Sequence, residues 1–442
     1  MAEFIDRLCD AVFEADGGDA DSRALLGRGI ADTVAVAAAG FAQPITRSAM
    51  QAYGGATVRA WSGEYCESRE AAVMINSMAS HALDFDDVYL EALAHPNTVI
   101  VPAILHLGTR HDADQIICAA AAGLIAARAI GGRLSQSHYL RGWHGTGTVG
   151  VFAAAASAGR LAALSTRQMK WAFGLAAAMS GGLQKNFSTM AKPCQAGFAA
   201  AAGMRAVRLA AANITASENI FEPNGYFDVY GDGRTALTED LFALRPDRIS
   251  VKLYPCCYAA SRLIGIALDA YKDLGSIFTD SAVNIELVVP EGSIEVLRYD
   301  NPTDGLQAKF SATYTVSVAL LDGIVSMPHF SDEALRRKDV RECMTRLKIS
   351  EDFAQPSGGE LETGVVRLRV FKHGDLVGSY SRQAIPGSPT DAATIDQIKM
   401  KAEACYSIFE GAFGHALPIL GEISTMTYVA PWVGGQIRIQ PE

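Results

Sequence analysis

Alanine-rich helical segments fill the first half of the chain and restrict what it can fold into. In four of them, many alanines accompany apolar residues that recur three and four positions apart, and glycine or proline separates the segments: residues 29–42, 151–164, 171–179 and 197–213. Alanine has a high helix propensity and no side chain beyond Cβ, so such helices form readily and approach one another closely. The first half therefore predicts a bundle of closely packed helices.

The sequence pattern changes near residue 282. Residues 283–287 and 366–370 alternate apolar with polar or charged side chains, which is typical of half-buried strands. His373 and Gly374 mark a hairpin turn after the second of these strands. Residues 308–323, between the two strands, predict a helix that ends at Gly323.

The order of these elements predicts two folding units. Residues 392–413 predict a late helix with its N-cap near Thr390 or Asp391. We therefore expect a large all-helical domain (residues 1–251), an inserted smaller α+β lid domain (252–387) and a return segment of the helical domain (388–442). The length of 442 residues allows two or three domains at ~100 to 200 residues each.

The composition excludes several classes of protein. With 49% hydrophobic and 19% charged residues, the chain is an ordinary globular protein rather than a disordered or collagen-like one. Its longest apolar run, residues 116–127, is shorter than the ~18 to 20 residues of a membrane span, and residues 1–10 lack the pattern of a signal peptide. Eight cysteines without metal-ligand spacing predict reduced thiols and no structural zinc. We expect a cytoplasmic protein that binds no membrane.

Charge is distributed unevenly along the chain. The net charge of −10 disfavours nucleic acid as a partner. Residues 115–217 nevertheless contain no Asp or Glu and ten Lys or Arg, which predicts a local positive field suited to a small polycarboxylate. Alternatively, these cations pair with acidic residues from elsewhere in the chain.

The segment from Gly145 to Gly150 reads GTGTVG and matches the GxGxxG dinucleotide fingerprint. No apolar strand precedes it, and no acidic residue occurs before Glu218, so the segment does not predict a Rossmann site. We interpret the glycines as backbone that passes near an anionic ligand at a helix start, next to His144.

Two imidazoles and three carboxylates lie within fifteen positions, in the segments HALDFDD (81–87) and HPNT (95–98). The spacing matches neither HExxH nor an EF-hand loop, so acid–base work by Asp84 or His95 is a better interpretation than metal binding. A cluster of capping and salt-bridging groups at a helix end is the structural alternative.

Two lysines lie beside prolines that stiffen the backbone: Lys192 precedes Pro193, and Lys252 is three residues before Pro255. A lysine held in this way suits carboxylate binding, although a lone loop lysine is ordinarily just solvated. Cys256 and Cys257 are adjacent, so at most one of them is expected to face a site.

Several motifs together resemble, in order and along nearly the whole chain, the MmgE/PrpD family. They are HALDFDD, HPNTVIVPAIL, HYLRGWHGTGTVGVFAAAAS, TMAKPCQAG, KLYPCC, AKFSATYTVSVALLDG and PGSPTD. The family includes 2-methylcitrate dehydratase, cis-aconitate decarboxylase and iminodisuccinate epimerase. The resemblance implies a helical domain interrupted by an α+β lid domain, an active site in the cleft between them, a homodimer, and no metal or organic cofactor.

The resemblance also implies which residues form the site. Its motifs place Asp84, His95, His144, Lys192, Lys252 and Tyr314 at family active-site positions, with Cys257 as a further acid–base candidate. Lys192, Lys252, Thr146 and Gln195 are expected to bind substrate. Gln195 and Ser261 stand where the family often has histidine.

These two departures direct the functional expectation. Gln195 and Ser261 cannot shuttle a proton near neutral pH, whereas a dehydratase must protonate its leaving group. We therefore expect an isomerase or epimerase acting at the carbon next to a carboxylate of a small di- or tricarboxylate. The alternatives are a lyase of the dehydratase or decarboxylase type and a non-catalytic carboxylate-binding homologue.

Overall fold

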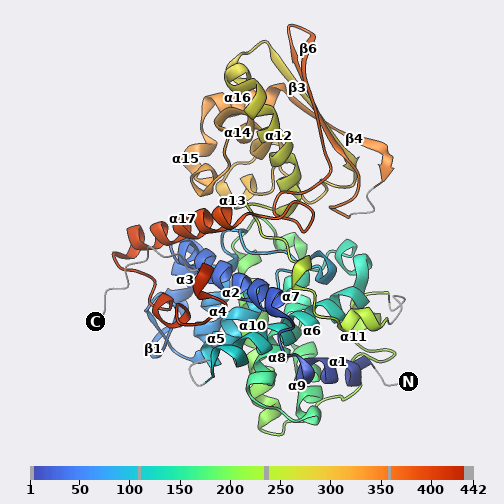
Figure 1. Ribbon diagram of the computed structural model, residues 1–442, viewed down its shortest axis with the longest axis vertical. Helices are drawn as coiled ribbons and strands as arrows, with labels where there is room; N and C mark the ends of the chain where they lie inside the picture. The colour runs from blue at the N-terminus through green and yellow to red at the C-terminus, as the bar shows by residue number, and fades with distance from the viewer. Residues whose placement is uncertain (1–3, 108–110, 233–237, 357–359, 433–442) are drawn as a thin grey trace. The chain divides into compact units, whose positions relative to one another are not determined.

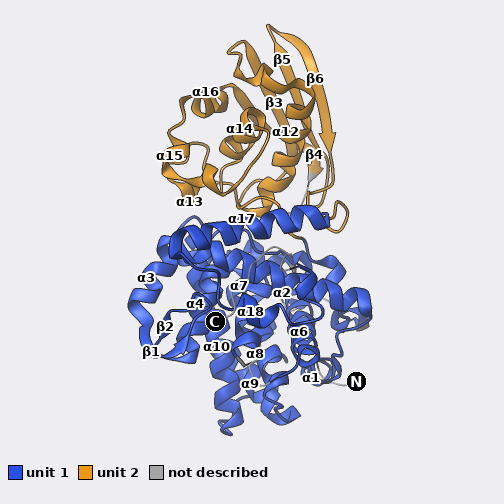
Figure 2. Cartoon of the chain, turned by 60° about the vertical axis from the view of Figure 1, so that its left-hand side comes forward, with its two compact units in different colours: residues 1–250, 394–442 blue, residues 251–393 orange. Residues whose placement is uncertain are grey.

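A computed structural model describes residues 4–107, 111–232, 238–356 and 360–432 (Figure 1). The chain forms two compact units (Figure 2): unit 1 comprises residues 1–250 and 394–442, and unit 2 comprises residues 251–393. The boundaries predicted from the sequence follow residues 251 and 387.

Unit 1 is built mainly from helices, with one small two-stranded antiparallel sheet. Its elements are α1 (Phe4–Glu14), α2 (Ala20–Phe41), α3 (Pro44–Tyr53), β1 (Gly54–Arg59), β2 (Tyr65–Cys66), α4 (Arg69–His81), α5 (Asn97–Leu107), α6 (Ala113–Leu140), α7 (Gly145–Thr148), α8 (Gly150–Leu161), α9 (Thr166–Ala178), α10 (Ala191–Ala211), α11 (Tyr226–Tyr230), α17 (Ile395–Phe413) and α18 (Leu420–Ile423). The sequence analysis did not predict the hairpin of β1 and β2.

Helix α10 packs against α4 and α8, α8 packs against α6, and α17 packs against α2. The alanine-rich composition accounts for the close spacing. A Cβ added to Gly203 on α10 would lie 2.6 Å from the Cβ of Ala154 on α8, so only very small side chains fit between these helices. The predicted bundle of closely packed helices is confirmed.

Two helices of unit 1 are long and apolar enough to cross a membrane. In α2 and in the first part of α6 (Ala113–Leu134), however, 78% and 83% of the apolar window is buried inside the protein. Their apolar surface is therefore covered by neighbouring helices, as in the core of a globular protein.

Unit 2 combines helices with a four-stranded sheet in the order β4-β3-β5-β6. Its elements are α12 (Ser261–Leu274), β3 (Val283–Glu291), α13 (Gly305–Ala308), α14 (Ala312–Asp322), α15 (Asp332–Leu335), α16 (Lys338–Arg346), β4 (Leu347–Pro356), β5 (Val366–Lys372) and β6 (Asp375–Arg382). Strand β3 is parallel to β4 and antiparallel to β5, and β5 is antiparallel to β6.

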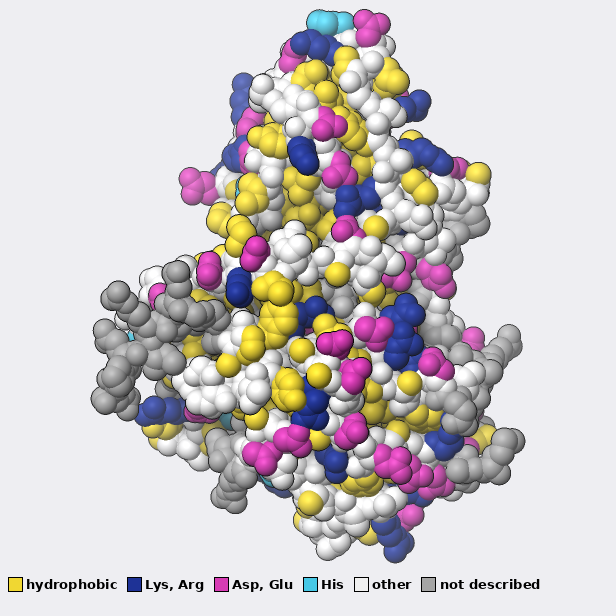
Figure 3. All heavy atoms as spheres, viewed as in Figure 1, with side chains coloured by type: hydrophobic (Ala, Val, Ile, Leu, Met, Phe, Trp, Pro, Cys, Tyr) yellow, Lys and Arg dark blue, Asp and Glu magenta, His cyan; other side chains and the backbone are white. Residues whose placement is uncertain are grey.

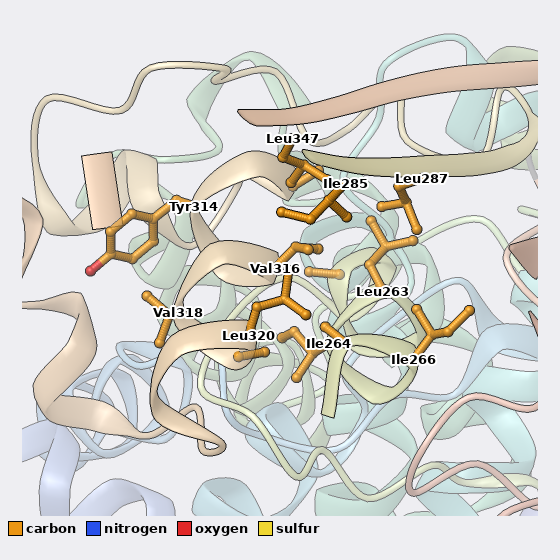
Figure 4. Packing of buried hydrophobic residues seen from close by; sticks show 14 of the residues in the cluster. Leu263, Ile264, Ile266, Ile285, Leu287, Tyr314, Val316, Val318, Leu320 and Leu347 are labelled. Carbon is orange, nitrogen blue, oxygen red and sulfur yellow. The ribbon is translucent and has the colours of Figure 1, made fainter. Parts of the chain in front are cut away.

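The predicted alternation of strand residues sets the core of unit 2. Ile285 pairs with Val370 and Leu287 pairs with Leu368, and all four are fully buried. Side chains from β3, α12 and α14 fill this core (Figure 4). The predicted turn at His373 and Gly374 is confirmed, since both residues have positive φ (52° and 92°), as a tight hairpin requires.

Three elements of the second half differ from the predictions. The expected helix over residues 308–323 is two helices, because Ser311 caps a new helix by accepting a hydrogen bond from the backbone N–H of Tyr314. The late helix α17 begins later than expected, capped by Thr394, while Asp391 forms an ion pair with Arg382. Strand β4 was not predicted.

The acid-free stretch of residues 115–217 is largely neutralised by the rest of the chain. Six of its ten cations pair with carboxylates from outside the stretch: Arg128 with Glu91 and Asp240, Arg167 with Glu218, Lys170 with Asp6, Lys192 with Asp84, and both Arg205 and Arg208 with Glu70. On the face shown in Figure 3, basic and acidic side chains are interspersed. The alternative interpretation of this stretch is therefore correct for most of its cations.

Candidate active site

The candidate site lies in unit 1, where the chain leaves α4 and turns toward α5. Asp84 in this turn is buried and has a left-handed backbone (φ 52°), which is uncommon for a residue with a side chain. Strain of this kind persists only where the surroundings hold it and is frequent at functional sites. The Asp84 side chain meets Lys192 in the first turn of α10, and the ring of His81 lies next to that of His144, which is the N-cap of α7.

Lys192 and Asp84 form a buried ion pair. The Lys192 Nζ is 2.7 Å from the Asp84 Oδ2, and the two side chains are 7% and 5% exposed. Lys192 belongs to the first turn of α10 rather than to a loop, and Pro193 is tolerated there because the first backbone N–H groups of a helix have no partner within it. Removing one member of such a pair leaves a buried charge uncompensated.

Three imidazoles gather beside this ion pair. The ring centroid of His81 is 4.8 Å from that of His95 and 5.8 Å from that of His144. Each Nδ1 lies 2.7 Å from an oxygen: the Asp86 carboxylate for His81, the Asp87 backbone carbonyl for His95 and the Gln195 amide oxygen for His144. The Nε2 atoms of His81 and His144 are buried and have no hydrogen-bond partner among the described residues.

Burial controls the protonation of two of these rings. Desolvation lowers the pKa of His144 well below its usual value, and the nearby His81, Lys192 and His95 lower it further. Desolvation also lowers the pKa of His81, against the opposing charge of Asp86. Both rings are therefore neutral near pH 7, and an anion bound beside them would favour their protonation.

A second group of buried charged residues contacts the same turn. Lys401 on α17 lies 2.8 Å from the Asp32 carboxylate on α2, and its Nζ also donates to the Phe85 backbone carbonyl at 2.8 Å. Asp87 accepts a hydrogen bond from the Asn97 side chain, and desolvation raises its pKa to about 7. Asp32 and Lys401 were not predicted as part of the site, although a charged residue inside the apolar α2 was a usable signal.

His81, Asp86 and His95 could together hold a metal ion, since they offer ligand atoms within 4.8 Å of one another. In the structure, Asp86 Oδ2 lies 2.7 Å from His81 Nδ1 and 3.3 Å from His95 Nδ1. Protons shared between these imidazole nitrogens and the Asp86 carboxylate account for the short nitrogen–oxygen distances. We interpret the group as a hydrogen-bonded network that orients imidazoles.

The predicted substrate-binding residues Thr146 and Gln195 lie in the site, but both form hydrogen bonds with histidines of the site. The Thr146 hydroxyl oxygen accepts a hydrogen bond from the His95 backbone N–H at 3.1 Å. Gln195 binds His144 through Oε1 and donates from Nε2 to the Leu183 carbonyl at 3.2 Å.

Gly145 and Gly147 of the GTGTVG segment pack closely against neighbouring backbone, and the contact of this segment with a ligand stays a prediction. A Cβ on Gly145 would collide with the backbone carbonyl of Leu93, and one on Gly147 would collide with that of Gly181. Helix α7 is therefore pressed against neighbouring backbone.

Four further residues singled out in the sequence belong to unit 2: Lys252, Cys257, Ser261 and Tyr314. Lys252 and Ser261 are fully buried, and Cys257 is partly buried against the core of unit 2. Tyr314 is 1% exposed, and its hydroxyl donates to the His329 backbone carbonyl. Figure 4 shows it at one end of the core, with the hydroxyl directed away from the labelled aliphatic side chains.

Comparison with known proteins gives two family matches and several relatives. The MmgE/PrpD N-terminal domain matches residues 6–238, and the MmgE/PrpD C-terminal domain matches residues 254–412. The cis-aconitate decarboxylase of Mus musculus is 25% identical over 304 residues, which cover 64% of this chain and 61% of that protein.

The corresponding protein of Aspergillus terreus is 27% identical over 338 residues, covering 70% of this chain and 69% of that protein. The one of Homo sapiens is 22% identical over 294 residues, covering 63% and 60%. The matched region thus spans about three fifths of the mouse and human relatives.

Proposed function

The chain belongs to the MmgE/PrpD family, and we propose that it is a lyase that decarboxylates a small unsaturated tricarboxylate of the cis-aconitate type. The observation that carries the proposal is a buried cation, Lys192, set beside two neutral imidazoles whose Nε2 atoms have no hydrogen-bond partner among the described residues. The relatives named cis-aconitate decarboxylase support the choice of reaction.

The buried cation explains how a polyanion would bind. Lys192 is neutralised by Asp84 in the free protein, so a substrate carboxylate must compete for the ammonium or share it. In a water-excluded site this contact contributes more than an exposed ion pair, which is worth ~0 to 1 kcal/mol. The negative charge of the substrate also raises the proton affinity of the neighbouring imidazoles.

This decarboxylation needs a proton donor and a group that stabilises developing negative charge. The bond between the departing carboxylate and the saturated carbon breaks, and its electron pair forms a new double bond as carbon dioxide leaves. The pair of the original double bond takes a proton from the protonated His144 at Nε2, and solvent then restores that proton. Lys192 stabilises the charge that develops on the conjugated carboxylate.

This proposal places the lyase ahead of the expected epimerase. The departures at Gln195 and Ser261 motivated the epimerase, but the relatives found by comparison are decarboxylases. Decarboxylation needs no acid for a hydroxyl leaving group, so the missing imidazoles do not argue against it. Roles for Lys252, Tyr314 and Cys257, a homodimer, a cytoplasmic location and the absence of a cofactor stay predictions from the family resemblance.

The test is incubation of the purified protein with cis-aconitate, 2-methylcitrate or a substituted succinate in D₂O, followed by proton NMR and carbon dioxide release. We expect carbon dioxide and one deuterium per product molecule from cis-aconitate, and loss of this activity in Lys192→Met. Water loss from 2-methylcitrate would instead identify a dehydratase. Exchange of an α-proton without loss of carbon would identify an epimerase. Calorimetric binding without any turnover would identify a non-catalytic homologue.

A further inference from the structure

A hydrogen-bond chain through Gln195 determines which nitrogen of His144 carries a proton. The chain begins at the Leu183 backbone carbonyl, which can only accept, so the Gln195 amide must direct its NH₂ group toward it (3.2 Å). This orientation presents the Gln195 Oε1 to the His144 Nδ1 at 2.7 Å. An amide oxygen also only accepts, so Nδ1 must be the protonated nitrogen.

The backbone of residues 181–183 holds both partners of this bond. The Gly182 carbonyl accepts a hydrogen bond from the His144 backbone N–H at 3.0 Å, and Leu183 forms an antiparallel bridge with Trp143. Gly182 has a φ of 142°, and a Cβ there would lie 2.9 Å from the Gln195 Oε1. The glycine therefore leaves the space in which the amide of Gln195 sits.

We propose that Gln195 is a positioning residue that keeps the His144 imidazole in its Nδ1–H form, so that His144 exchanges protons with a substrate only at Nε2. This inference goes beyond the proposed function and relies on it only for the substrate used in the kinetic assay. The buried Nε2, without a hydrogen-bond partner among the described residues, is the nitrogen that the arrangement leaves for chemistry.

The titratable groups that act on His144 come from three segments: His81 from α4, His95 from the turn before α5 and Lys192 from α10. Two of them are imidazoles and the third is a cation, so they disfavour a charged ring rather than select a tautomer. The choice between Nδ1–H and Nε2–H is left to Gln195, through its direct contact with Nδ1.

The primary test observes the tautomer without any substrate. Histidine labelled with ¹⁵N in the full chain gives long-range ¹H–¹⁵N correlations, in which the His144 signals are identified by their loss in His144→Asn. Wild type should show Nδ1 protonated and Nε2 unprotonated. Gln195→Met, which keeps the volume but removes the acceptor, should lose this single pattern, whereas Gln195→Glu should retain a protonated Nδ1.

Gln184→Met is the matched control. Gln184 is equally buried and donates to the Tyr139 and Trp143 carbonyls at 2.7 Å and 3.0 Å, and its side chain forms no hydrogen bond with the His144 ring. This variant should lose stability, as Gln195→Met does, but keep the wild-type tautomer. Retention of the Nδ1–H pattern in Gln195→Met, or its loss in Gln184→Met, would overturn the proposal.

A kinetic measurement separates positioning from a merely structural role. With a decarboxylation assay, Gln195→Glu should move the basic limb of the pH profile of kcat/KM upward by about one pH unit, because a carboxylate next to Nδ1 favours the charged ring that donates the proton. Gln195→Met should lower kcat about tenfold or more with a smaller change in KM. An unmoved basic limb in Gln195→Glu contradicts the proposal. If no variant, wild type included, turns over cis-aconitate while the tautomers behave as expected, the proposed function fails and the inference stands.

Discussion

At the scale of single residues, His138 and His144 differ in whether both ring nitrogens have partners. His138 Nδ1 contacts the Tyr230 carbonyl and its Nε2 contacts the Thr148 hydroxyl, each at 2.7 Å, which is the pattern of a structural histidine. His144 has a partner only for Nδ1 among the described residues. We therefore expect His144→Ala to lower kcat by ~10² or more with little loss of thermal stability.

His138→Ala is the control for that prediction. It should destabilise the fold by roughly 1 to 3 kcal/mol, because two buried hydrogen bonds are lost, while the folded fraction keeps most of its kcat. Thermal melts and steady-state kinetics on both variants check this. A large fall in melting temperature for His144→Ala with unchanged kcat in the folded fraction would make His144 a core histidine instead.

The Lys192–Asp84 pair combines a structural and a functional role, which a double variant separates. Lys192→Met should raise KM for the carboxylate substrate at least tenfold and destabilise the fold by about 3 to 5 kcal/mol, because Asp84 is left buried without its partner. Adding Asp84→Asn should recover much of the stability but none of the affinity. Recovery of KM in the double variant would show that Lys192 does not bind substrate.

At the scale of elements, close backbone contact fixes helix α7 and, with it, its N-cap His144. Gly147→Ala would drive a methyl group into the Gly181 carbonyl, so we expect about 1 to 3 kcal/mol of destabilisation and a lower kcat. Gly181→Ala is the matched control, since a Cβ there meets no atom within 4 Å and should change stability by less than about 0.5 kcal/mol. Denaturant titrations of both variants decide the point, and equal stabilities would show that α7 can shift without cost.

At the scale of the whole molecule, buried histidines make stability depend on pH. Burial lowers the pKa of His106 and of His138 to about 4, and it also lowers the pKa values of His81 and His144. Below their ordinary value of about 6.5 the unfolded chain binds protons that the folded chain does not. Stability should therefore fall as the pH drops from about 6.5 toward 4, by up to about 1.4 kcal/mol per pH unit for each such group.

Buried carboxyl groups oppose this trend only in part. The pKa of Asp87 is raised to about 7, so its contribution is complete below the unfolded value of about 4 and is lost as the pH rises through 7. Desolvation also raises the pKa of Asp32. Four imidazoles outweigh these two groups, so urea titrations should give a lower free energy of unfolding at pH 5 than at pH 7. His106→Leu should reduce the dependence of the free energy of unfolding on pH by the contribution of one histidine. A free energy of unfolding that does not change with pH would contradict the assignment.

Features that depend on neighbours along the chain could be predicted from the sequence. Helix propensity and apolar spacing predict α2, α8, α9, α10 and α17 of unit 1, and strand alternation predicts β3, β5 and the turn at His373 and Gly374. Local clustering and motif resemblance also select Asp84, His95 and His144, which lie together in the structure because a short turn and one N-cap hold them. Helix boundaries were less predictable, since Ser311 and Thr394 are two of many possible caps.

The contacts of each side chain in the site could not be predicted from the sequence, because they depend on how distant segments pack. Asp32 and Lys401 are 369 positions apart, and no local pattern pairs them. Gln195 suggests a substrate ligand in the sequence, but Leu183 and His144 occupy both ends of its amide. The cations of residues 115–217 suggest a positive field, but distant carboxylates neutralise most of them. Hydrogen bonding and desolvation act between atoms that folding brings within a few ångströms, so the sequence supplies the groups and the packing of the helices assigns their partners and protonation.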